Sequence, residues 1–114
     1  MRSELTKEVK DPAMVTFSDR VVVPAHVLIR HLDGESVLLN LESETYFGLD
    51  ATGTRMWEVA TQSASLEAAY AVLVQEFEVE PGVLRANLGE LMARLIENGL
   101  LKRSSADVGS LPAV

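Results

Sequence analysis

The sequence predicts an α+β domain in which a three-stranded antiparallel sheet is followed by three helices. Asp33-Gly34 is a favoured hairpin turn, because both positions of a type I′ turn need a positive φ, and β-prone segments flank it on both sides. After Asp50 the apolar residues recur at helical spacing in three successive segments. With 114 residues, 47% of them hydrophobic and 24% charged, the chain is long enough for one domain with its own core and too short for two.

The Asp33-Gly34 turn sets the register of the first two strands. Counting outward from it pairs Leu32 with Glu35, Arg30 with Val37 and Leu28 with Leu39 on one face, and His31 with Ser36 and Ile29 with Leu38 on the other. A second reversal is expected at Glu42-Ser43-Glu44, as a type I turn followed by one residue in the αL conformation. That three-residue turn would pair Leu41 with Thr45, Leu39 with Phe47 and Val37 with Leu49.

Under this register the two faces of the sheet differ in composition. One face collects Leu28, Val37, Leu39, Leu41, Phe47 and Leu49, and the other collects Ile29, Leu38, Asn40, Tyr46 and Gly48. The first face is therefore predicted to face the core. The strand from Thr45 to Leu49 is expected at the outside of the sheet, with one edge unpaired unless the short run at Val21 to Val23 covers it.

Capping residues predict where the helices begin and end. Asp50 is expected to cap a helix from Ala51 to about Thr61, and Ser65 a second helix that ends near Glu78. Pro81 is expected to open the third helix, where its missing N–H costs nothing, and Gly99 to stop it. The third helix has the most regular apolar stripe in the chain, formed by Leu84, Leu88, Leu91, Met92, Leu95 and Ile96.

Composition also sets the expected surroundings of the domain. Residues 1–17 and 104–114 show no sustained periodicity and are expected to be flexible tails around a domain of residues 18–103. The chain has no cysteine, no signal-peptide core and no run of about 18 apolar residues, so a cytoplasmic protein that does not enter a membrane is expected. The net charge of −7 repels phosphate backbones and disfavours nucleic acid as a partner.

Catalytic and metal-binding patterns are poor in this sequence. His26 and His31 are expected to be solvent-facing residues of one strand, and their odd spacing of five turns them to opposite faces, so they cannot share a metal ion. Glu42 and Glu44 are interpreted as solvated charges of a turn. No nucleophile elbow, P-loop or dinucleotide fingerprint is present. The chain is thus expected to be no enzyme and to hold no metal or cofactor.

A sheet followed by three helices resembles winged-helix DNA binders, but the charges disfavour that function. The third helix carries Arg85 and Arg94 balanced by Glu90 and Glu97. The strand Thr45–Leu49, in contrast, has no internal charge or proline to block its edge, and such an edge can accept an extended peptide through main-chain hydrogen bonds. A winged-helix transcription regulator and a non-catalytic interaction subunit of a larger complex remain as alternatives.

Several segments resemble the PqqD-like family of peptide-recognition domains: Ser36 to Leu41, Thr45 to Asp50, Gly53, Met56-Trp57 and Leu95 to Leu101. The resemblance covers residues 20–102, and its most specific part, Tyr46 to Trp57, is similar to the small stand-alone members that serve lasso-peptide biosynthesis. At Glu44, related sequences often have glycine.

The resemblance implies a winged-helix-like fold and the function of a RiPP recognition element, which binds the leader segment of a ribosomally synthesised precursor peptide. It implies that the leader adds as a strand to the third strand and lies against the third helix. Carried over to this chain, the peptide-binding residues would be Thr45, Tyr46, Phe47, Gly48, Leu49, Leu84, Arg85, Leu88, Gly89 and Met92. A leader peptidase or another modifying enzyme is implied as a further partner, and monomer and dimer both remain open.

Overall fold

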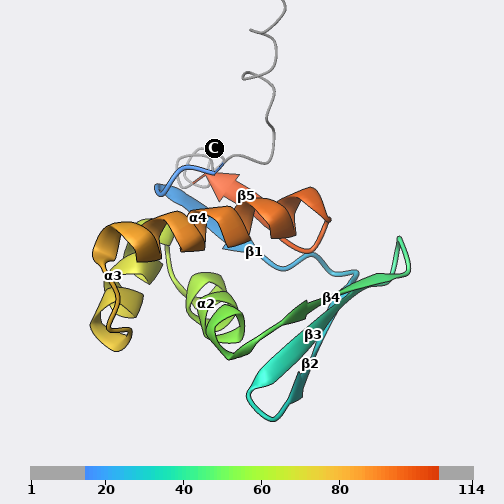
Figure 1. The fold of residues 1–114 in the computed structure, drawn as a ribbon. Coiled ribbons are helices and arrows are strands. Elements are labelled where there is room, and N and C mark those ends of the chain that lie inside the picture. The colour runs from blue at the N-terminus through green and yellow to red at the C-terminus, as the bar shows by residue number, and fades with distance from the viewer. Residues whose placement is uncertain (1–14, 106–114) are drawn as a thin grey trace, which may run out of the picture.

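A three-stranded antiparallel sheet leads into three helices, and a two-stranded ribbon joins the two ends of the described chain (Figure 1). The structure is a computed structural model that describes residues 15–105, with only the backbone of Ser105. Its elements are β1 (Asp19–Val22), β2 (Val27–Leu32), β3 (Glu35–Asn40), β4 (Thr45–Leu49), α2 (Ala51–Gln62), α3 (Leu66–Glu76), α4 (Pro81–Glu97) and β5 (Lys102–Ser105). The predicted α+β class, with a meander before three helices, is confirmed.

The helix starts follow the capping residues. The Asp50 side chain accepts a hydrogen bond from the Gly53 N–H at 2.8 Å, and the Ser65 hydroxyl accepts one from the Ala68 N–H at 3.1 Å. Pro81 is the first residue of α4. These three predicted starts are confirmed.

The end of α4 is also the predicted one. Gly99 has a φ of +73°, and the Leu100 N–H donates to the Leu95 carbonyl at 2.8 Å. The helix therefore stops in a left-handed glycine, and the chain turns into β5.

The first hairpin also has the predicted register. Asp33 and Gly34 have φ values of 47° and 84°, the positive values of a type I′ turn. Leu32 lies opposite Glu35, and each further pair of β2 and β3 is the one counted from the sequence.

The second hairpin differs from the prediction by one residue. Its turn contains four residues, 41–44, and Asn40 rather than Leu41 lies opposite Thr45. The Asn40 side chain accepts hydrogen bonds from the backbone N–H groups of Glu42 at 3.0 Å and Ser43 at 3.2 Å, which stabilises the longer turn. Glu44 does adopt the predicted αL conformation, with a φ of 60°. The three-residue turn and the pairs counted from it are wrong.

The predicted core face is wrong for β2 and β3. Leu38 is fully buried, whereas Leu28 and Leu41 are 45% and 55% exposed. Phe47 and Leu49 of β4 do turn inward as predicted. A one-residue change of register exchanges the two faces of a strand, so β4 could be assigned correctly while its neighbours were not.

Two polar residues lie on the true core face because each has a hydrogen-bond partner there. The Ser36 hydroxyl lies 2.7 Å from the Thr54 hydroxyl of α2. The Asn40 amide donates to the Asn98 carbonyl at 3.1 Å. Buried polar groups are tolerated when they are paired, and both partners are distant in sequence.

The strand β1 pairs with β5 and not with β4. The sequence predicted a β-prone run at β1 but no strand at β5, so Ser104 and Ser105, expected in a tail, are the last residues of a strand. Val15 and Phe17, also expected in a tail, pack against the core. Residues 1–14 and 106–114 of the expected tails lie outside the described residues.

His26 precedes β2 instead of lying within it, and it is half-buried. Its Nε2 donates to the Gly99 carbonyl at 3.2 Å. The expectation of a solvent-facing strand histidine is therefore wrong for His26 and holds for His31, which is exposed on β2.

A candidate binding groove beside strand β4

The edge of β4 opposite β3 has no strand beside it among residues 15–105. In a two-residue hairpin the closing pair, here Leu32 and Glu35, is a hydrogen-bonded pair, and such pairs alternate along an antiparallel ladder. Carried through β3, this alternation turns the N–H and C=O groups of Tyr46 and Gly48 toward the open edge. Both residues can therefore hydrogen-bond an extended peptide.

A groove of about 450 Å³ lies beside this edge, between β4, α2 and α4. From β4 and its end come Phe47, Gly48, Leu49 and Asp50; α2 contributes Thr52, Gly53 and Met56; α4 contributes Asn87, Leu91 and Arg94. The groove thus combines apolar side chains with polar ones in equal number.

Close packing at the start of α2 forms one wall of the groove. A Cβ added at Gly53 would lie 3.3 Å from both the Asp50 carboxylate and the Leu49 side chain. Glycine at this position therefore lets the capping carboxylate reach the helix backbone. The Asp50 side chain is engaged in this cap through its hydrogen bond with the Gly53 N–H.

Arg94 lies at the opposite wall. Its guanidinium carbon is 5.5 Å from the centroid of the Phe47 ring, within the range of a cation–π interaction. This contact links α4 to β4 across the groove.

The five β4 residues predicted to bind peptide form the strand at this groove. Phe47, Gly48 and Leu49 line it directly. Tyr46 is 75% exposed and points to the other face of the sheet, and Thr45 is exposed at the start of the strand.

Three of the α4 residues predicted for the site belong to the core instead. Leu84, Leu88 and Met92 are each at most 1% exposed and pack in the central apolar cluster. The structure does not bring their side chains to the groove.

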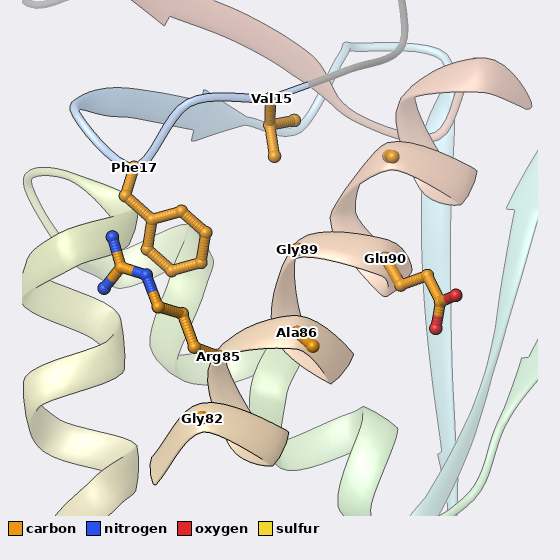
Figure 2. Close-up of a pocket in the computed structure, with 8 residues that line it drawn as sticks. Val15, Phe17, Gly82, Arg85, Ala86, Gly89 and Glu90 are labelled. Atoms are coloured by element: carbon orange, nitrogen blue, oxygen red, sulfur yellow. The ribbon is translucent and has the colours of Figure 1, made fainter.

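The other two, Arg85 and Gly89, lie on a different side of α4, beside Phe17 (Figure 2). The Arg85 guanidinium stacks on the Phe17 ring at 3.9 Å and pairs with Glu67 at 3.0 Å. This hydrogen-bonded pair holds the pKa of the Glu67 carboxyl below its usual value. A Cβ at Gly89 would lie 3.5 Å from the Phe17 ring, so the space beside this glycine is occupied by an aromatic side chain of the same chain.

The α4 residues that do line the groove are Asn87, Leu91 and Arg94. Their spacing of four and three residues places them on one side of a helix, next to the buried stripe. Leu91 was part of the predicted apolar stripe. Its polar neighbours Asn87 and Arg94, one turn before and after it, are the sequence signal that could have identified this side of α4 as the groove side.

No group of three or more metal-ligating side chains occurs in residues 15–105. Within the same residues, no helix combines the length and the hydrophobicity that crossing a bilayer requires.

The fold and the groove define a small winged-helix-like domain with an open strand edge beside a helix. The family model described as coenzyme PQQ synthesis protein D (PqqD) matches residues 35–101, more than half of the chain. This chain belongs to the PqqD family, which confirms the resemblance seen in the sequence.

Two solved structures have a similar fold. "TbiB1 in Complex with the TbiA(beta) Leader Peptide" is 31% identical, with a TM-score of 0.66, over 71% of this chain and 94% of that chain. "Lasso peptide synthetase B1 complexed with the leader peptide" has a TM-score of 0.65 over 72% of this chain and 96% of that chain, and at 23% identity it supports the fold alone. A comparison with curated proteins gives no match.

Proposed function

We propose that this chain binds the leader segment of a ribosomally synthesised precursor peptide, of the lasso-peptide type, by adding it as a strand to β4. The observation that carries this proposal is the open edge of β4 beside a partly apolar groove. It is supported by TbiB1, a 31% identical protein whose solved structure contains a leader peptide. The chain binds its ligand without catalysis, and its cysteine-free sequence fits a cytoplasmic protein.

Strand addition needs outward-facing hydrogen-bonding groups on β4, and the geometry of this strand supports the proposal. A partner strand lies about 4.8 Å away and hydrogen-bonds to the outward N–H and C=O groups, which belong to Tyr46 and Gly48. Beyond its two chain neighbours, no atom lies within 4 Å of a Cβ added at Gly48, so the sheet face that this residue shares with Tyr46 is uncrowded there.

Alternate leader side chains then point into the groove between β4 and α4. The proposed binding residues are accordingly Thr45 to Leu49 on the strand side, and Asn87, Leu91 and Arg94 on the helix side. The last three replace the α4 residues expected from the sequence.

We further propose that the complex is presented to a leader peptidase or another modifying enzyme through the outer face of the sheet. On this face Leu28, Leu39 and Tyr46 lie side by side across the three strands. Leu28 and Tyr46 are 45% and 75% exposed. A leader strand added to β4 extends this same face, so an enzyme seated there contacts carrier and leader together.

The binding function is tested by fluorescence polarisation with a labelled leader peptide encoded in the same gene cluster. The expected result is saturable binding with a dissociation constant of roughly tens of micromolar or tighter, and no binding of a scrambled leader. A folded protein that does not bind the leader in this range contradicts the proposal.

Presentation is tested separately with Leu28→Asp, which puts a charge on the outer face at the strand farthest from β4. We expect unchanged leader affinity and slower processing of the precursor by the enzyme. Processing at the wild-type rate would refute the role of the outer face and leave leader binding untouched.

A further inference from the structure

Arg94 differs from the other groove-lining residues in carrying a positive charge with no carboxylate beside it. Arg55, Arg85 and Arg103 pair with carboxylates at 2.7, 3.0 and 3.8 Å. Among residues 15–105, no carboxylate lies within 4.0 Å of the Arg94 guanidinium. The chain has 17 acidic and 10 basic residues, so a carboxylate partner was available in the composition but is not placed here.

The structure holds Arg94 at the groove without using its donors. The guanidinium carbon of Arg94 lies 5.5 Å from the centroid of the Phe47 ring. This contact places the positive charge beside β4, next to Gly48. The backbone carbonyl of Arg94 accepts bonds from Asn98, at 3.1 Å from the backbone N–H and 2.8 Å from the side-chain amide. The helix end is thereby fixed while the five N–H donors of the guanidinium remain available.

The chemistry of this wall favours one kind of ligand group. A guanidinium presents a planar fork that matches a carboxylate, and such charge-assisted hydrogen bonds are stronger than neutral ones. The apolar side chains of Phe47 and Leu91 beside it exclude water once a strand covers the groove. The one carboxylate of the groove lining, Asp50, is engaged by the Gly53 N–H at 2.8 Å in the cap of α2.

We propose that Arg94 binds a carboxylate side chain of the leader, an aspartate or glutamate that the added strand turns into the groove near Phe47. This inference rests on the proposed leader-binding function and adds a selection rule to it: leaders with an acidic residue at this register bind, and those with a neutral or basic residue there bind weakly.

The test is a polarisation titration of the labelled leader against Arg94→Gln, Arg94→Glu and the matched control Arg30→Glu. Arg30 is exposed on β2, at the far edge of the sheet, and its reversal changes the net charge by the same amount. We expect the dissociation constant to rise about 10-fold for Arg94→Gln and about 100-fold for Arg94→Glu, the latter equal to about 2.7 kcal/mol. Arg30→Glu should change it less than about threefold.

Charge exchange identifies the leader residue. Each acidic residue of the leader is replaced by lysine in turn, and at one position the lysine leader should lose affinity for the wild type and regain it with Arg94→Glu. Equal losses for Arg94→Glu and Arg30→Glu, or no acidic leader position whose replacement weakens binding, would overturn the inference while leader binding by the wild type stands. A wild type that binds no leader defeats the proposed function itself. Arg94→Glu adds an acidic side chain to a helix that already carries Glu90 and Glu97. Arg94→Gln adds none, so its leader affinity tests the inference even if Arg94→Glu disturbs the helix.

Discussion

Replacing Gly48 with proline tests strand addition at the level of a single N–H group. The alternation of the ladder turns the Gly48 N–H toward the open edge, so proline removes a donor that the leader needs and not one that β3 uses. The leader carbonyl opposite it is left without a partner, which costs about 1–3 kcal/mol, or roughly five- to 150-fold in dissociation constant. The free energy of unfolding should change by about 1 kcal/mol or less, since no ladder hydrogen bond is lost.

Gly48→Ala is the matched control, because it keeps the N–H and its Cβ meets no atom within 4 Å. Leader affinity is measured by fluorescence polarisation and stability by urea denaturation of the same three proteins. Alanine should bind the leader nearly as well as glycine. If proline lowers stability as much as it lowers affinity, or if alanine weakens binding as much as proline, the N–H does not serve the leader and the reasoning fails.

Three further substitutions test the fold around the site. Gly99→Ala should lower the free energy of unfolding by about 2 kcal/mol, measured by urea denaturation. Alanine is strained at a φ of +73°, and its Cβ would lie 2.8 Å from the Asn40 amide nitrogen. An unchanged denaturation midpoint would contradict this geometry. Leu38→Ala should lower the free energy of unfolding by about 2–5 kcal/mol, since the side chain is fully buried. A loss below about 1 kcal/mol would indicate that the opposite face of the sheet is the buried one. Glu67→Gln should lower the thermal midpoint slightly at pH 7, because pairing with Arg85 lowers the carboxyl pKa from 4.5 and so stabilises the fold above that pH. The difference should vanish as the pH falls below the lowered pKa, and a difference that persists in acid would exclude the ion pair as its cause.

The first hairpin and the helix starts were predictable because each depends on groups a few residues apart. Asp33-Gly34 needs only its own positive φ values, and the caps at Asp50 and Ser65 bind N–H groups three residues on. The second hairpin was not, because Asn40 closes a longer turn with its side chain and no spacing rule distinguishes three turn residues from four.

The candidate site was half predictable. The edge strand could be recognised because charges and prolines that would block it are absent from its sequence. The helix side was missed because Leu88 and Leu91 have the same apolar chemistry, and packing buries the first and leaves the second at the groove. The sequence does not show that Arg94 lacks a carboxylate partner within residues 15–105, because that is a property of its three-dimensional neighbours.

By itself, the sequence determined the order of the elements from β2 to α4 and the turn at Asp33-Gly34, which follow from local backbone chemistry. The edge of β4 stays unpaired within residues 15–105 because β1 pairs with β5, which is a tertiary contact. The tertiary structure decided which face of the sheet is buried. Val37, Leu38 and Leu39 are all apolar, so their chemistry allows either face to be buried. The hydrogen bonds of Ser36 with Thr54 and of Asn40 with Asn98 allow these two polar residues to lie on the buried face together with Leu38. β5 likewise depends on tertiary pairing. Its residues are polar and do not predict a strand, and they form one by pairing with β1.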